Sequence, residues 1–188
     1  MQLSQEDHNL MKAVRNGDVN KLATLYDRHQ RPLFNFFLRL TASRPVSEDL
    51  VQDVFTRILK YRASYADQEN FPAWMYRIAR NAHIEHARRH RLEVVPADPE
   101  TTPEPVSAAP GPDSQAEYGQ NVALLRRALT RLPEDKREVL ILSRFQNLRY
   151  EEIANILDCE VGTVKVRVYR AVRQLEEIYH QLAGEKAS

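Results

Sequence analysis

The sequence predicts an all-α protein of two small helical domains joined by a flexible, acidic, proline-rich linker. On both sides of residues 93–116, apolar residues recur at helical spacing with almost no strand-like alternation. Residues 93–116 hold six of the ten prolines, five acidic side chains, and no basic or aromatic residue. Such a composition cannot repay the entropy of ordering. We therefore expect domains at residues 1–92 and 117–188 and a linker at residues 93–116.

The distribution of charge along the chain indicates which kinds of partner the protein can bind. The net charge of +1 resolves into +5 for residues 1–92, −5 for residues 93–116 and +1 for residues 117–188. A basic first domain is compatible with nucleic acid even though the total is near zero. No run approaches the roughly 18 apolar residues of a membrane span, and the N-terminus has no signal-peptide pattern. We expect a cytoplasmic protein without membrane insertion.

The first domain contains three helices before residue 62. The first is expected to begin with Ser4 as its cap and to end at Asn16-Gly17. The second begins near Asp18 and should bend or restart at Pro32. The third is expected to be capped by Ser47, with one apolar face and a polar face that runs from residue 48 to residue 60.

A fourth helix is expected to open at Phe71-Pro72 and to run to about Arg91, with proline tolerated in its first turn. Steps of about 100° per residue place four residues on its outer side, with Arg80 and Ile84 beside them: Trp74, Arg77, Asn81 and Arg88. Two interpretations are open. The face is either a solvated basic surface with a half-buried tryptophan, or a platform where the indole stacks on an unstacked base and arginines hold phosphates.

The second domain contains a helix-turn-helix pattern. Helices at residues 122–132 and 134–145 precede a short helix at residues 148–157, a turn at residues 158–160 and a long helix from Val161. Several residues of the long helix project away from the domain, with Arg167 at the boundary: Lys165, Val166, Tyr169, Arg170 and Arg173. A helix with these side chains fits the DNA major groove, whereas the alternative is a helical hairpin with a solvated basic face.

At these residues the sequence resembles the ECF (extracytoplasmic-function) sigma factors, bacterial transcription initiation factors of two domains. The N-terminal resemblance lies in Tyr26-Asp27-Arg28, residues 48–55 and residues 71–81. The C-terminal resemblance lies in Leu132-Pro133, residues 150–154 and residues 161–165. It covers roughly residues 20–92 and 118–178, in the family's order. The first domain is thereby expected to be sigma region 2 and the second region 4.

The resemblance implies three sets of site residues. The expected partner is core RNA polymerase, with its β and β′ subunits, and the first set would dock on β′: Asp49, Gln52, Asp53 and Arg57. The second would bind the −10 element, with loop 62–67 capturing a flipped base: Arg62, Ser64, Tyr65, Trp74, Tyr76, Arg77, Arg80, Asn81 and Arg88. The third would read the −35 duplex: Arg149, Thr163, Lys165, Val166, Arg167, Tyr169, Arg170 and Arg173.

The resemblance also implies an anti-sigma factor as a partner, no cofactor and no catalysis. Two departures affect the −35 preference. Arg149 stands where the family often has the Ser or Thr of a capping box, and Val166 replaces a frequent small polar residue.

Two other functions remain open. His83, His86 and His90 lie near one another on the fourth helix and could suggest a metal or acid–base site, although their order is not that of a zinc motif. A stand-alone helix-turn-helix regulator is the second alternative, and it would need a dimerising surface. The one cysteine, Cys159, is better explained as a small packing residue than as a redox sensor.

Overall fold

The computed structural model describes residues 2–68, 70–93 and 112–185. All regular secondary structure in these ranges is helical, which confirms the all-α prediction. The elements are α1 (Gln2–Arg15), α2 (Lys21–Thr41), α3 (Arg44–Tyr61), η1 (Arg62–Ser64), α4 (Phe71–Glu93), α5 (Pro112–Arg131), α6 (Glu134–Leu140), η2 (Ile141–Phe145), α7 (Tyr150–Leu157) and α8 (Val161–Glu185). None of the described helices is long and apolar enough to cross a membrane.

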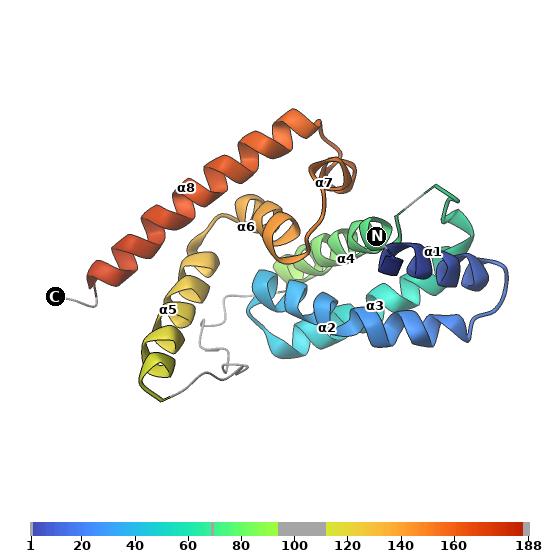
Figure 1. Ribbon diagram of the computed structural model, residues 1–188, viewed down its shortest axis with the longest axis horizontal. Coiled ribbons are helices and arrows are strands. Elements are labelled where there is room, and N and C mark those ends of the chain that lie inside the picture. Colours follow the sequence, from blue (N-terminus) through green and yellow to red (C-terminus); the bar gives the residue numbers. More distant parts are fainter. Residues whose placement is uncertain (1, 69, 94–111, 186–188) are drawn as a thin grey trace.

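The helices form an N-terminal unit of α1–α4 and a C-terminal unit of α5–α8 (Figure 1). Most of the predicted linker, residues 94–111, lies outside the described residues. Its two ends are helical, because Glu93 closes α4 and Pro112 opens α5.

The core of the N-terminal unit forms where the apolar stripes of α2, α3 and α4 meet. Phe36 and Phe37 of α2, Val54 of α3 and Met75 of α4 are fully buried there. Helix α2 continues through Pro32, so the expected restart does not occur. The fully buried Leu33, Phe36 and Phe37 follow directly and offset the hydrogen bond that proline cannot donate.

Both serines predicted as helix caps lie inside helices. Ser4 is the third residue of α1, and Ser47 is the fourth of α3, which begins at Arg44 after the N-cap residue Ser43. Pro45 takes a first-turn position of α3, where its fixed backbone angle suits the start of a helix. Ser47 is buried, and its hydroxyl donates to the Ser43 carbonyl at 2.6 Å.

The C-terminal unit contains the predicted helix-turn-helix. Helix α7 ends at Leu157 and is followed by Asp158, whose left-handed backbone (φ 50°) turns the chain sharply into α8. Val164, Val168 and Ala171 of α8 are buried in the unit's core. A smaller cluster joins α5 to the far end of α8 through Leu124, Ala128 and Leu182.

A buried ion-pair group fixes α1 to α2. The Asp7 carboxylate is 2.9 Å from Nη1 of Arg28 and 2.8 Å from Nε2 of His29, and Asp7 is buried. Glu6 also pairs with Arg28, at 3.1 Å, but its side chain is mostly exposed. Of these two acidic residues, Asp7 therefore makes the buried contact that ties α1 to α2.

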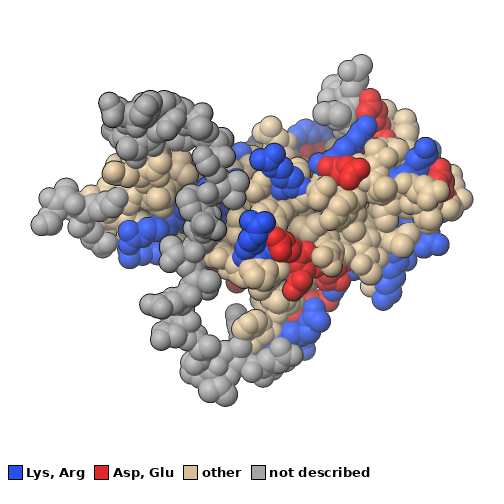
Figure 2. Space-filling model, turned by 90° about the horizontal axis from the view of Figure 1, so that it is seen from below, with Lys and Arg blue, Asp and Glu red and all other residues tan. Residues whose placement is uncertain are grey.

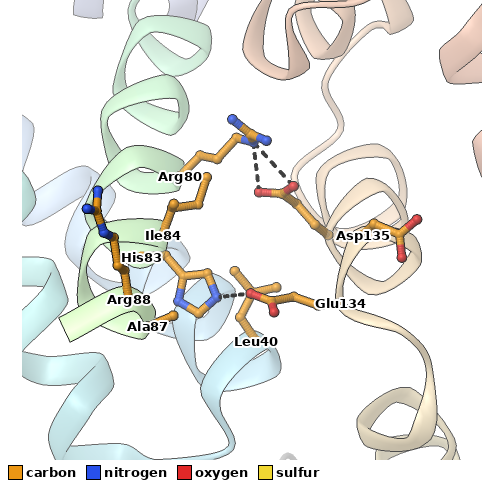
Figure 3. Close-up of a pocket in the computed structure, with 9 residues that line it drawn as sticks. Leu40, Arg80, His83, Ile84, Ala87, Arg88, Glu134 and Asp135 are labelled. Atoms are coloured by element: carbon orange, nitrogen blue, oxygen red, sulfur yellow. Dashed lines mark hydrogen bonds and ion pairs between the residues drawn. The ribbon is translucent and has the colours of Figure 1, made fainter. Parts of the chain in front are cut away.

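The two units pack against each other through α4. Tyr76 donates its hydroxyl hydrogen bond to Oε1 of Gln146 at 2.5 Å, and Arg80 lies 3.2 Å from a carboxylate oxygen of Glu138. Figure 3 shows Arg80 and His83 projecting from α4 toward α6, whereas Arg88 points away from His83. The same contact leaves an open cavity of about 630 Å³ between the two helices.

Three further contacts join the units. Arg137 donates to the Leu40 carbonyl at 2.8 Å, and the Arg39 guanidinium lies 4.3 Å from the ring centre of Phe145. Asn70, just before α4, donates to Oε1 of Glu152 at 2.7 Å. Two helical units that the sequence places at either end of a linker are thus in direct contact.

One interface group is sensitive to protonation. Burial lowers the pKa of His83, although the neighbouring Glu134 acts in the opposite direction. Nε2 of His83 is 3.0 Å from the Glu134 carboxylate, whereas the buried Nδ1 has no hydrogen-bond partner among the described residues. Protonation would bury a second N–H without an acceptor, so the neutral ring is the stable form here.

Replacing Asp7 by Ala is expected to destabilise the N-terminal unit by about 1–3 kcal/mol, because it removes a buried carboxylate that accepts two hydrogen bonds. Glu6→Ala is the matched control and should cost about 0–1 kcal/mol, since its ion pair is exposed. Urea unfolding followed by circular dichroism measures both. Equal losses would contradict the assigned role of Asp7.

His83 is expected to make stability depend on pH. Its pKa in the folded protein is below the ordinary 6.5, so the unfolded chain binds more protons between the two values. Its contribution is therefore complete above pH 6.5 and decreases as the pH falls toward the folded pKa. His83→Asn should reduce the loss of stability between pH 7.5 and pH 5.5.

His180→Asn, at an exposed position of α8, is the control and should leave the pH profile unchanged. Urea midpoints measured across this range test the assignment. A His83→Asn profile as steep as the wild-type profile would show that another group is responsible.

Candidate nucleic-acid interface

The outward face of α8 carries the side chains predicted to read duplex DNA. Val166 is 47% exposed and Tyr169 is 66% exposed, both high values for side chains of this size and polarity. The cations on this helix are exposed as well: Lys165, Arg167, Arg170 and Arg173. Thr163 is half-buried beside them. Buried residues of the same helix hold the opposite face in the core, so this face is presented by a rigid support.

The start of α7 keeps one half of the capping box whose Ser or Thr is replaced by Arg149. Oε2 of Glu152 accepts from the backbone N–H of Arg149 at 2.7 Å, which is the carboxylate half of the motif. A guanidinium has no acceptor, so Arg149 cannot complete the other half. Its exposed side chain instead lies 3.3 Å from Oε1 of Glu152. Arg149 keeps the exposure that a phosphate contact would need.

The outer side of α4 is divided between exposed and buried residues. Arg77, Asn81 and Arg88 are exposed, as the helical spacing predicted. Trp74 and Tyr76, however, are only 2% and 3% exposed, so the prediction of an exposed indole platform is wrong for this structure. The Trp74 ring packs against the rings of Tyr65 and Phe71, at centroid distances of 5.2 and 6.4 Å. The loop before α4 thus covers a side that the helix alone would leave open.

Arg80 and Tyr76 are engaged with the C-terminal unit. Both contact its polar side chains, Arg80 through Glu138 and Tyr76 through Gln146. Burial raises the pKa of Glu138, and the nearby Arg80 partly opposes that shift. These contacts were not predicted, because partners 58 and 70 residues apart leave no signal in the periodicity of either helix.

The loop at residues 62–67 begins with the single turn η1. Arg62 donates to the Leu59 carbonyl at 2.7 Å, and the exposed Ser64 donates to the Tyr61 carbonyl at 2.8 Å. Tyr65, predicted to contact DNA, is only 1% exposed. The loop therefore exposes small side chains and buries its aromatic ring.

The outer face of α3 holds the four residues predicted to bind polymerase. Asp49 and Gln52 are exposed. Arg57 lies 3.0 Å from Asp53 and 2.7 Å from Glu85 of α4, so two of the four form a network with a carboxylate of the neighbouring helix. Hydrogen bonds to Glu85 and then to Asp53 raise the pKa of Arg57, and the same guanidinium lowers the pKa of Glu85.

The histidines of α4 have separate environments. His83 pairs with Glu134, whereas the rings of His86 and His90 face each other at 6.0 Å. No group of three or more metal-ligating side chains occurs within the described residues. Cys159 is a partly buried residue packed against the core at the turn into α8.

Charge on the surface is mixed rather than segregated. Figure 2 shows one face of the molecule on which basic and acidic side chains alternate. Between α4 and α7, Arg77 and Arg149 line the same cavity of about 550 Å³ together with the acidic Glu151 and Glu160. Residues predicted to contact different DNA elements therefore lie beside each other in this arrangement.

Comparisons with known proteins match both units. The sigma-70 region 2 family matches residues 25–93, and the sigma-70 region 4 family matches residues 123–175. The ECF RNA polymerase sigma factor EcfG of Rhodopseudomonas palustris is 34% identical over 145 residues, or 77% of each chain. CarQ, an RNA polymerase sigma factor of Myxococcus xanthus, is 30% identical over 94% of this chain and 99% of its own.

The fold is also found in solved structures. The sigma factor RpoE of Bartonella quintana, solved with the anti-sigma factor NepR, has a TM-score of 0.66 and 27% identity over 83% of this chain and 94% of its own. CnrH, solved with the cytosolic domain of CnrY, shares the fold with a TM-score of 0.67 at 21% identity over 93% of this chain and 97% of its own. With both regions matched and an ECF relative 34% identical over 77% of each chain, the chain belongs to the ECF family of RNA polymerase sigma factors.

Proposed function

We propose that this sigma factor binds core RNA polymerase through the outer face of α3, directs it to promoters and opens the −10 DNA. It carries out no bond-making chemistry itself. The observation that supports the proposal most is the exposed face of α8, where four cations flank an exposed valine and tyrosine. Guanidinium groups suit guanine edges and phosphates, and an apolar side chain suits a thymine methyl group.

The −10 contacts are proposed for the exposed part of α4 and its preceding loop. Arg77, Asn81 and Arg88 share one side of the helix, so a single strand could follow it while the arginines hold phosphates. Asn81 offers an amide that can both donate to and accept from a base edge. Trp74 supports this surface from beneath, as part of the ring cluster with Tyr65 and Phe71.

The arrangement of Figure 1 cannot bind the −10 and −35 elements at the same time. Positions −35 and −10 are separated by roughly 25 base pairs, which at 3.4 Å per pair is about 85 Å of duplex. In the structure α4 and α7 are in contact, with Asn70 2.7 Å from Glu152. We therefore propose that the units separate on the polymerase, which frees Tyr76 and Arg80 from Gln146 and Glu138.

The proposed partners are core RNA polymerase, promoter DNA and an inhibitory protein. The Bartonella relative was solved with an anti-sigma factor, and a similar partner here would hold the units together or cover their DNA faces. The alternative of a stand-alone regulator requires specific duplex binding without polymerase. Membership of the sigma family disfavours it.

Transcription in vitro with core polymerase and genomic DNA tests the function. Defined transcript starts that depend on this chain are expected, and they give its promoters. Duplex binding with no effect on polymerase would instead support the stand-alone regulator.

Asn81→Ala should reduce open-complex formation at such a promoter by about tenfold, because one base contact is worth roughly 1–3 kcal/mol. Its affinity for core polymerase should stay unchanged. Asn9→Ala, at an exposed position of α1, is the control. Permanganate footprinting and fluorescence binding provide the two measurements. A parallel loss of polymerase affinity would refute the assignment of Asn81 to DNA.

Glu138→Lys is expected to open the contact between the units. It places a second cation beside Arg80 on a side chain that is only partly accessible to solvent, which disfavours the closed form. Small-angle X-ray scattering of the free protein should show a larger radius of gyration. Asp135→Lys, at an exposed position of the same helix, should change it little.

Binding of a −35 duplex serves as the folding control for the Glu138→Lys variant, because Glu138 does not belong to the α8 face. A Glu138→Lys protein that binds this duplex normally yet stays as compact as the wild type would show that the pair does not hold the units together.

A further inference from the structure

Helix α1 contacts the candidate base-capturing loop at several points. Nδ1 of His8 is 2.9 Å from the Tyr65 hydroxyl, and Nη1 of Arg15 donates to the Tyr65 carbonyl at 2.8 Å. Nη2 of Arg15 donates to Oδ1 of Asp67 at 2.7 Å, with Lys12 at 3.4 Å from the same oxygen. The match to sigma region 2 begins only at residue 25, so it assigns nothing to this helix.

Tyr65 is the buried point of attachment. Its ring is enclosed by Trp74 and Phe71 on the α4 side, and its hydroxyl meets His8 on the α1 side. A side chain in this position cannot stack on a DNA base without leaving the core. Tyr65 therefore anchors the loop, while Ala63, Ser64, Ala66 and Asp67 are exposed to a ligand.

Arg15 determines the path of the chain after that anchor. Its guanidinium bridges a backbone carbonyl and a carboxylate two residues apart, so the two hydrogen bonds fix the segment from Tyr65 to Asp67 across Ala66. Hydrogen bonding to Arg15 lowers the pKa of Asp67, so the carboxylate is charged at neutral pH and the bond is charge-assisted. Lys12 contributes a longer ion pair to the same carboxylate, at 3.4 Å.

Helix α1 is itself firmly placed. The buried Asp7 ties it to Arg28 and His29 of α2, and Met11 and Val14 are fully buried. Arg15 and His8 thus extend from a fixed support rather than from a loose terminus. A loop held in its binding conformation loses less entropy when a ligand binds, so its affinity and selectivity are higher.

We infer that His8 and Arg15 are positioning residues for −10 recognition: from α1 they fix the shape of the loop at residues 62–67 that receives the flipped base. This inference rests on the proposed function. It gives α1 a part in promoter selectivity, although none of these contacts touches DNA.

The test uses the full chain in holoenzyme with core polymerase, and fluorescent single-stranded oligonucleotides that carry the −10 sequence of a promoter mapped with the wild type. For each −10 position, four oligonucleotides carry the four possible bases. The affinity for the best base divided by the affinity for the worst base gives the selectivity ratio at that position. Arg15→Ala should lower affinity for the best sequence by about tenfold and reduce the ratio at the captured position by up to the same factor, because the worst base gains little from a fixed loop. Arg15→Lys keeps the positive charge but lacks the planar guanidinium that makes both hydrogen bonds. Its ratio should lie between those of the wild type and Arg15→Ala.

Lys12→Ala is the matched control, since it removes a cation of the same helix whose ion pair among the described residues is with Asp67. The ratio for Lys12→Ala should stay within about twofold of the wild-type ratio, because Arg15 still donates to the Tyr65 carbonyl. Tyr65→Phe provides an independent variant: it removes the hydroxyl that meets His8 and keeps the ring in the core. It should reduce the ratio in the same direction as Arg15→Ala.

The ratio separates positioning from a loss of folded protein, because a smaller folded fraction lowers the signal for all four bases equally. An Arg15→Ala ratio equal to the wild-type ratio would overturn the inference, whatever the change in overall affinity. A wild-type holoenzyme that fails to initiate would overturn the proposed function instead.

Discussion

The structure depends on the packing of α4 on two sides. Met75, Ala79 and Ala82 of this helix are buried in the N-terminal core. On its other sides Tyr76, Arg80 and His83 meet polar side chains of α6 and the residues after it. The same helix carries the exposed Arg77 and Asn81. Any movement of the C-terminal unit therefore changes the surroundings of the proposed −10 surface directly.

The sequence predicted most of the helices because they follow from local periodicity. The buried and exposed faces of α3 and α8 agree with their 3.6-residue patterns, and the turn at residues 158–160 lies where it was expected. The predictions were wrong where a residue or segment outside the local pattern determines whether a side chain is buried or where a helix begins. A helical wheel placed Trp74 outside, but the ring of Tyr65 covers it. The capping potential of Ser47 was overridden because Pro45 takes a first-turn position, and α3 starts at Arg44 instead of at residue 48.

The contact between the units could not be predicted from the sequence, for a related reason. Hydrogen bonds such as Arg137 to the Leu40 carbonyl join residues 97 positions apart, and neither residue has a local pattern that names the other. Some proposed site residues were predictable because their exposure follows from the spacing within a single helix: Arg77 and Asn81 of α4, and Lys165 and Arg170 of α8. The support provided by His8 and Arg15 was not, since it depends on how α1 lies against a distant loop.

Glu152 shows how the helix-turn-helix can leave the N-terminal unit without losing its own structure. Its two carboxylate oxygens have different partners: Oε2 accepts from the backbone of Arg149 at the start of α7, and Oε1 accepts from Asn70. Separation of the units breaks only the second bond. Oε1 then keeps the Arg149 guanidinium, which already lies 3.3 Å away, and gains water in place of Asn70, while Oε2 keeps the first turn of α7 closed. One side chain thus serves as a detachable link on one oxygen and a permanent helix cap on the other.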